Sequence, residues 1–399
     1  MYERIIEHMK ITGVRSQLYE IELTRPLGDA NFPEGNTHVA MSALWLDTDE
    51  GVTGVSFGGG ETVEHMVNEL LVGRDPRGVR GHWKRMVDAV FKGNNRGTVS
   101  GAIAAIDVAL WDLKAKLNNE PLWRTLGASS RRVKAYASDI GMNLSDDALR
   151  QFYAGMAAKG IHAGKVKVGL DQAMDARRIG IMRDALATNP GGKTPVLTID
   201  SNEYWSPKQA IRHISEFERH FDLTWVEEPA RRWDYRGLRQ VSRAVRAAVA
   251  TGENLNDISE FMPLIANEAV DIVQFNSGVS GITGALMTAD MAYGFELPVA
   301  MMNCPASFMA HVAAALPNHM MMEVLDAGIE QGVVHRHNIE DGHIVLSDDP
   351  GLGIAFDEAF VTTHAVEHPS ANVRMPFPRR RGAGLYQVGP NEPNGLREE

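Results

Sequence analysis

Four short polar segments decide the fold of this chain: Lys165-Val166-Lys167, Asp200-Ser201-Asn202, Glu227-Glu228-Pro229 and Gly252-Glu253-Asn254. Each follows a short apolar run that is typical of a β-strand, and segments with helical periodicity separate them. Strands that alternate with helices predict a parallel sheet, and in a (β/α) barrel the ends of successive strands face one rim. Because catalysis takes place at that rim, the four segments predict a barrel with its site at the mouth.

The spacing of three acids matches one β/α repeat. Asp200 and Glu227 lie 27 positions apart (227 − 200), and Glu227 and Glu253 lie 26 apart (253 − 227). One unit of an eight-unit barrel takes roughly 30 residues, so we expect the acids on three adjacent strand ends. One such acid alone would be interpreted as a solvated loop residue, but three at one repeat would not. Three carboxylates without Cys or His suit Mg²⁺.

Two lysines lie one repeat earlier. Alternation along a strand places Lys165 and Lys167 on the same face. Two surface lysines are the ordinary alternative, but these follow a strand bounded by glycine and precede Val168-Gly169.

Taken in order, the four segments resemble the mandelate racemase subgroup of the enolase superfamily over roughly residues 10–365. The resemblance implies an α/β fold, a (β/α)₇β TIM-like barrel with an N-terminal α+β capping domain. It places the capping domain at 1–131, completed by 327–399, and the catalytic barrel at 132–326. It also implies one Mg²⁺, held by the three acids, and abstraction of the proton α to a carboxylate.

The resemblance implies roles for single residues as well. Lys167 is the base, Lys165 contacts the substrate carboxylate, and Asn202 binds a substrate hydroxyl. Glu323 stands at the eighth-strand position, where a glutamic acid hydrogen-bonds the developing enediolate.

The expected first barrel strand, 133–138, places Tyr136 and Ser138 inward, where the resemblance implies contact with substrate. A packed tyrosine and a turn serine are an equally good interpretation.

The proposed base must be neutral near pH 7, although the pKa of a free lysine is about 10.4. A neighbouring ammonium and a nearby metal ion both disfavour the charged form of a lysine. Mg²⁺ on the substrate carboxylate stabilises the enediolate as it forms. The pairing of Lys165 with Lys167 is therefore expected to lower the pKa of the base.

One departure from the family pattern limits the chemistry. Members that racemise, and many that dehydrate, carry an Asp-His dyad after the sixth and seventh strands. Here those positions hold Asn276 and Asn303, and we assign both to substrate binding. An amide cannot accept and return a proton as imidazole does, so racemisation is not expected. The muconate-lactonizing pattern also fails, because no lysine follows the sixth strand.

Other side chains are weaker candidates. His311 is the nearest replacement for the missing imidazole, but a structural role is the commoner one inside a helix expected over 305–316. Cys304 could line the pocket, and His335 and His337 are expected at the surface.

Three functional hypotheses remain open. The first is a Mg²⁺-dependent acid-sugar dehydratase of carbohydrate catabolism, a lyase that works from one face. The second is a lactone cycloisomerase or another lyase that forms the same enolate. The third is a metal-binding homologue that has lost catalysis with its dyad. Fold alone does not distinguish them.

Composition limits the partners. The chain has 399 residues, a formal net charge of −11 and one cysteine. The negative charge and the lack of a basic stripe argue against nucleic acid. No apolar run approaches the roughly 20 residues that span a membrane, and the N-terminus shows no signal pattern. We expect a cytoplasmic homo-oligomer that acts on a small sugar acid.

The N-terminal part predicts strands over 10–23, 38–46 and 52–57, and helices over 62–72, 78–91 and 101–117. The resemblance implies that a loop over 24–37 and a glycine loop over 57–62 face the barrel mouth and select substrate. The acids Asp107 and Asp112 are expected to be capping or pairing groups. The tail over 379–399 is expected to be an extended arm.

Overall fold

The computed structural model describes residues 9–93, 95–278, 281–373 and 384. The arm expected over 379–399 lies outside the described residues, apart from Gly384. In the described part of the chain, no helix is long and apolar enough to cross a membrane.

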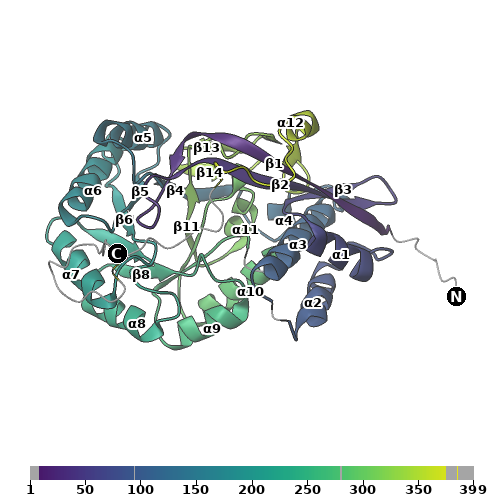
Figure 1. Cartoon of the computed structure of the whole chain (residues 1–399), viewed down its shortest axis with the longest axis horizontal. Helices are drawn as coiled ribbons and strands as arrows, with labels where there is room; N and C mark the ends of the chain where they lie inside the picture. The colour runs from purple at the N-terminus through teal and green to yellow at the C-terminus, as the bar shows by residue number, and fades with distance from the viewer. Residues whose placement is uncertain (1–8, 94, 279–280, 374–383, 385–399) are drawn as a thin grey trace.

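Eight parallel strands form a closed barrel (Figure 1). The first strand also pairs with the last, through Glu323 and Tyr136, which closes the sheet. In chain order the strands are β4 (Arg132–Ser138), β5 (Ala163–Lys167), β6 (Val196–Asp200), β7 (Leu223–Glu227), β8 (Ala248–Thr251), β9 (Ile272–Phe275), β10 (Val299–Met301) and β11 (His319–Val324).

Seven helices of the described chain alternate with these strands and surround the barrel (Figure 1). The predicted (β/α)₇β order is confirmed. Several helices begin at a side-chain cap, and Ser206 and Gln209 form a reciprocal capping box at the start of α7. The helices are α5 (Asp146–Ala158), α6 (Gln172–Leu186), α7 (Pro207–Phe217), α8 (Tyr235–Ala244), α9 (Ile258–Ala266), α10 (Gly281–Gly294) and α11 (Ala310–Ala315).

The helix predicted over 305–316 is wrong in part. A short 3₁₀ turn, Pro305–Ser307, precedes α11, and the two are separate. Ala306 and Ser307 have φ values of 52° and 49°, in the left-handed region, so a continuous right-handed helix cannot pass through them.

The described residues of the N-terminal region form an antiparallel sheet and four helices. Its strands are β1 (Ile11–Leu27), β2 (Asn36–Thr48) and β3 (Thr53–Phe57), and its helices are α1 (Glu61–Leu70), α2 (Val79–Val90), α3 (Thr98–Leu117) and α4 (Leu122–Thr125).

The loop expected over 24–37 is shorter than predicted. The hairpin continues to the pair Leu27 and Asn36, so only residues 28–35 connect β1 to β2. Gly28 donates its N–H to the Ile140 carbonyl at 2.7 Å, and Met142 donates to the Gly28 carbonyl at 3.1 Å. The loop is therefore attached to the segment that follows the first barrel strand.

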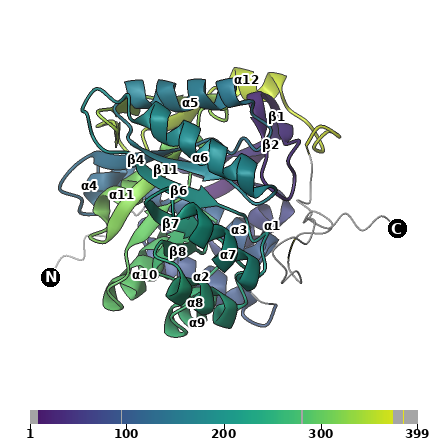
Figure 2. The ribbon, with the colours of Figure 1, turned by 90° about the vertical axis from the view of Figure 1, so that its left-hand side faces the viewer.

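The chain after β11 contacts both parts of the molecule. It contains β12 (Val333–His335), β13 (Asn338–Glu340), β14 (His343–Val345), β15 (Ile354–Phe356) and α12 (Glu358–Thr363). Strand β14 pairs antiparallel with the start of β4, whereas α12 packs beside β1 (Figure 2).

Two buried acids of α3 join this helix to other parts of the chain: Asp107 to the barrel, and Asp112 to β3 and to the segment between β14 and β15. Asp107 accepts hydrogen bonds from the N–H and hydroxyl of Thr283 on α10, at 2.8 and 2.6 Å. Asp112 accepts from the N–H groups of Val55 and Leu352, at 2.8 and 2.7 Å, and pairs with Lys116 at 2.6 Å. The prediction that these acids are pairing groups is confirmed.

We expect Asp112→Ala to lower the free energy of unfolding by roughly 3 kcal/mol or more, since two buried N–H groups and a lysine lose their acceptor. Urea denaturation measures the change. Asp88→Ala is the matched control, because Asp88 pairs with Lys84 on an exposed helix face. A loss no larger than that of the control would contradict the role of Asp112.

Candidate functional site

The candidate site lies inside the carboxyl end of the barrel, where neighbouring strands end with charged residues. Lys167 is the last residue of β5 and pairs in register with Asp200, the last residue of β6. Asp200 pairs in register with Glu227, the last residue of β7. Glu253 follows β8 by two residues. The predicted acids thus lie on three adjacent strand ends.

Lys165 lies at the centre of an ionic network. Its Nζ lies 2.6 Å from Glu227 Oε1, 2.9 Å from Glu323 Oε1 and 3.5 Å from Asp200 Oδ2. All four side chains are fully buried. The network joins strands β5, β6, β7 and β11 across the barrel.

Lys167 belongs to the same network. Its Nζ donates to Asp200 Oδ2 at 2.5 Å and to Asn202 Oδ1 at 2.9 Å. Asn202 in turn donates its backbone N–H to Asp200 Oδ1 at 2.8 Å and has a left-handed φ of 45°. Such backbone conformations occur often at functional sites.

The carboxylates decide the charge state of both lysines. Burial lowers the pKa of Lys167, but Asp200 raises it above the ordinary value, and the opposing effect of Lys165 is smaller. Burial likewise lowers the pKa of Lys165, and Glu227 with Glu323 raises it well above the ordinary value. Lys165 does lower the pKa of Lys167, as expected, but the carboxylates raise it by more. Both lysines are therefore ammonium groups in this arrangement.

The acids exceed the bases at the barrel mouth. Burial raises the pKa of Glu227 despite Lys165, and repulsion from Asp200 and Glu253 raises it further. Burial and Asp200 likewise raise the pKa of Glu253 to about 6. Hard oxygen donors under mutual repulsion fit a divalent cation.

Among the residues that the structure describes, no three His, Cys, Asp or Glu side chains converge closely enough to hold a metal ion. The lysines instead contact two of the predicted ligands, Asp200 and Glu227.

Glu323 is held by an amide that stands where the family pattern has histidine. Asn303 donates its Nδ2 and backbone N–H to Glu323 Oε2, at 2.5 and 3.1 Å. Among the described residues, the side chain of Asn276 bonds backbone groups: it donates to the Glu253 carbonyl at 2.7 Å and accepts from the Gly278 N–H at 2.6 Å. The structure therefore brings Asn303 into the network, whereas Asn276 shapes the loop after β9.

Tyr136 and Ser138 point inward from β4 but differ in their surroundings. Tyr136 packs edge-to-face on Trp225, with ring centroids 5.2 Å apart, and its ring lies 5.7 Å from Lys165 Nζ. It belongs to the apolar layer beneath the lysines. Ser138 is fully buried, and its Oγ has no hydrogen-bond partner among the described residues.

Three polar residues of the site had no role in the sequence interpretation. Gln274 donates to Glu227 Oε2 at 2.6 Å, and Glu228, with a left-handed φ of 45°, accepts from Asn254 at 2.8 Å. Period-two alternation with Asn276 could have indicated Gln274, because both then face inward from one strand. Nothing in the order of the residues indicates the contact with Glu227.

A cavity of about 790 Å³ opens at the barrel mouth. Its walls combine site residues, the loop after β7 and the N-terminal hairpin. Among its lining residues are Asn202, Glu228, Glu253, Arg231, Trp233 and His38. The loop over 28–35 contributes Asn31 and Phe32, as expected for a segment that faces the mouth.

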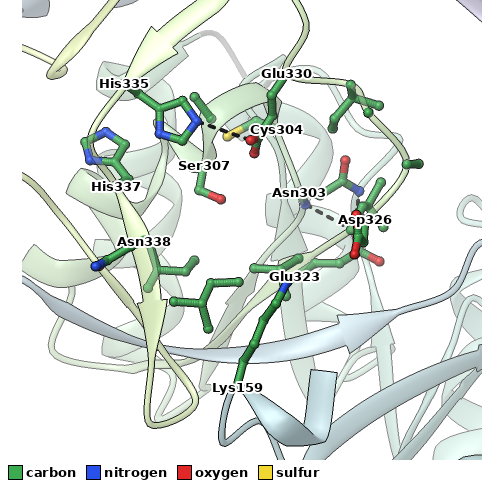
Figure 3. Close-up of a pocket in the computed structure, with 18 residues that line it drawn as sticks. Lys159, Asn303, Cys304, Ser307, Glu323, Asp326, Glu330, His335, His337 and Asn338 are labelled. Carbon is green, nitrogen blue, oxygen red and sulfur yellow. Dashed lines mark hydrogen bonds and ion pairs between the residues drawn. The ribbon is translucent and has the colours of Figure 1, made fainter. Parts of the chain in front are cut away.

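A second cavity, of about 360 Å³, is lined by Asn303 and Glu323, which do not line the first (Figure 3). Cys304 lines it, as expected, but burial raises the pKa of this thiol to about 12. His335 pairs with Glu330 at 3.2 Å. His337 is buried, so the prediction that it lies at the surface is wrong. Its Nδ1 accepts from the Ser347 N–H at 3.1 Å, and its Nε2 donates to the Leu352 carbonyl at 3.0 Å.

His311 has a structural position. Its Nδ1 accepts from Trp123 N–H, so its Nε2 carries the proton that bonds the Leu352 carbonyl; both distances are 3.0 Å. Burial lowers the pKa of His311 to about 3. The neutral ring has both nitrogens occupied and does not replace the missing imidazole.

Two family models match the chain. Residues 36–127 match the mandelate racemase / muconate lactonizing enzyme N-terminal domain, and residues 148–360 match the enolase C-terminal domain-like model. The second range contains every strand of the barrel except β4, which lies between the two matched ranges.

Similar proteins act on sugar acids. The L-talarate/galactarate dehydratase of Salmonella typhimurium is 30% identical over 366 residues, which are 88% of this chain and 89% of that protein. Its crystal structure with Mg and L-lyxarohydroxamate has a TM-score of 0.81 at 28% identity, over 92% and 95% of the two chains. The 3,6-anhydro-alpha-L-galactonate cycloisomerase of Streptomyces coelicolor is 28% identical, over 87% of this chain and 97% of that protein.

The lowered pKa of His311 predicts a pH-dependent contribution to stability. The folded protein keeps the ring neutral, whereas the unfolded chain takes up a proton below pH of about 6.5. The contribution is therefore complete above that pH and is lost as the pH falls toward the folded pKa of about 3.

We expect His311→Gln, which keeps one donor and one acceptor, to be less stable than the original protein at pH 7.5. Below pH 6.5 the difference in unfolding free energy should shrink by about 1.4 kcal/mol per pH unit. Urea denaturation at pH 7.5, 6.5 and 5.5 measures it. A difference that does not change with pH would mean that His311 titrates normally.

Proposed function

Because the chain belongs to the mandelate racemase/muconate lactonizing enzyme family of the enolase superfamily, we propose that it is a Mg²⁺-dependent acid-sugar dehydratase. The observation that carries this proposal is the buried network of Lys165, Lys167, Asp200, Glu227 and Glu323 at the barrel mouth. The network brings together a base, a positive charge that can pair with a substrate carboxylate, and oxygen ligands for a metal ion.

Asp200, Glu227 and Glu253 would hold the metal ion, which accounts for the excess of acids at the mouth. When bound, Mg²⁺ would neutralise the acid cluster, favour the neutral form of Lys167 and stabilise the charge that develops on the substrate carboxylate.

Lys167 takes the proton from the carbon next to the carboxylate. Lys165 remains an ammonium group and neutralises the carboxylate, which becomes an enediolate as the C–H bond breaks. Glu323, held by Asn303, lies 2.9 Å from Lys165 and keeps that ammonium group in position beside the substrate carboxylate.

Elimination completes the reaction. The enediolate electrons form the double bond between the α and β carbons, and the β-hydroxyl leaves. Lys167, now protonated, returns its proton to that hydroxyl on the same face, so one molecule of water is released. Asn276 and Asn303 cannot accept and return a proton, so the opposite face has no second base in the dyad positions.

A cycloisomerase is the second candidate. It needs the same enolate but expels a ring oxygen, which requires less help from an acid than a hydroxyl does. The amides at positions 276 and 303 and the likeness to a cycloisomerase favour it. Mass spectrometry distinguishes the two: dehydration removes the mass of water from an open acid, whereas isomerisation of a lactone leaves the mass unchanged.

We expect Lys167→Ala to lower the turnover of any consumed sugar acid by roughly 10²–10⁴-fold, because the proton acceptor is lost. Keto-acid formation measures turnover, and circular dichroism confirms the fold. Lys208→Ala, an exposed lysine on the outer helix α7, is the control and should keep full activity. Retained turnover in Lys167→Ala would overturn this assignment.

Magnesium binding has its own test in Glu253→Gln. The ion pairs of the two lysines are with Asp200, Glu227 and Glu323, so changing Glu253 removes a metal ligand with little disturbance of the network. Calorimetric titration with MgCl₂ should show about 10-fold weaker binding or more. Glu268→Gln, which removes an exposed carboxylate, controls for net charge. Equal affinity in the two variants would contradict the assigned ligand.

A further inference from the structure

The barrel-mouth cavity is lined by two consecutive arginines from the loop after β7, and only one of them is paired. Arg232 donates its Nε to Glu203 Oε1 at 2.5 Å and its Nη1 to the Asn254 carbonyl at 3.1 Å. Arg231 has no ion pair with any carboxylate of the described residues, and its Nε is buried without an acceptor.

An unpaired guanidinium in a cavity is costly. A buried charged donor without an acceptor loses its hydration and gains nothing in return, so such groups are normally paired. Three acids of the same cavity are engaged elsewhere: Glu203 with Arg232, Asp29 with the N–H groups of Asn31 and Phe32, and Glu228 with Asn254. The fourth, Glu253, accepts from Asn254 at 3.4 Å and is a predicted metal ligand. We therefore expect a bound ligand, and not a protein side chain, to supply the hydrogen-bond acceptor for Arg231.

Trp233 holds the guanidinium in one orientation. The Arg231 Cζ lies 4.8 Å from the ring centroid, so the aromatic ring contacts the face of the guanidinium. The N–H groups lie in the guanidinium plane, and because the Nε is buried, the two Nη groups are the donors that a ligand in the cavity can reach. A planar fork of N–H donors fits a carboxylate with two parallel hydrogen bonds.

We propose that Arg231 binds the second carboxylate of a dicarboxylic sugar acid, so that the substrate class is an aldarate and not an aldonate. This inference rests on the proposed function, which places the first carboxylate at Lys165 and the metal ligands. The cavity that Arg231 lines also reaches the predicted metal ligand Glu253 and Asn202, whose side chain accepts from Lys167.

Charge supports the same choice. The first carboxylate is matched by the metal ion and Lys165, whereas a second one deeper among Glu227, Glu228 and Glu253 would be repelled. Within the described lining of the cavity, Arg231 is the arginine without a carboxylate partner. A neutral terminal hydroxymethyl group would leave that charge unmatched.

The test compares ligands that share configuration and differ in one terminal group: galactarate with D-galactonate, and D-glucarate with D-gluconate. Binding is measured by calorimetry with Mg²⁺ present, in a Lys167→Ala background that prevents turnover. We expect at least one aldarate to bind more tightly than its aldonate. Arg231→Gln should weaken the binding of that aldarate by on the order of 10- to 100-fold and change the affinity for the aldonate by about twofold or less.

Arg243→Gln is the matched control. It removes the same charge from the same loop-helix segment, but Arg243 is exposed and pairs with Glu268 outside the cavity. Equal affinity for aldarate and aldonate, or equal weakening of both by Arg231→Gln, would overturn the inference and leave the proposed function standing. If no acid of the panel binds and none exchanges its α-proton with the original protein, the proposed function falls and this inference with it.

Discussion

Burial of two lysine ammonium groups among carboxylates is the constraint on which this structure depends. Lys165 is fully buried and Lys167 nearly so, and an ion without a partner in that position costs several kcal/mol. The barrel provides the partners because parallel strands in register bring Asp200 and Glu227 beside the lysines. The ionic network is therefore a property of the strand pairing, and the same pairing creates the excess of acids.

The remainder of the chain closes and encloses this network. Pairing of β11 with β4 brings Glu323 within reach of Lys165, and Asn303 on the neighbouring strand end fixes its orientation. The loop over 28–35 is attached by hydrogen bonds to the segment after β4, so it forms a wall of the mouth. Asp107 of α3 then joins the N-terminal region to the barrel, and Asp112 joins it to the segment between β14 and β15.

The parts of the site that depend on position along the chain could be predicted from sequence. Period-two alternation placed Lys165 and Lys167 together, and the repeat of 26 or 27 residues placed the three acids on adjacent strands. Contacts that depend on barrel closure could not, and Gln274 with Glu227 is an example. The charge state of Lys167 also escaped prediction, because it depends on the 2.5 Å contact with Asp200 rather than on the neighbouring lysine.

The central claim is that proton transfer takes place on one face of the substrate. The most direct test is incubation with Mg²⁺ in D₂O, followed by NMR of the recovered acid and of the product. The account predicts deuterium at the α-carbon with retained configuration, together with a product of elimination. A deuterated epimer would reveal a base on the opposite face, and no exchange with any acid despite bound Mg²⁺ would mean that the lysine and the metal do not perform this chemistry.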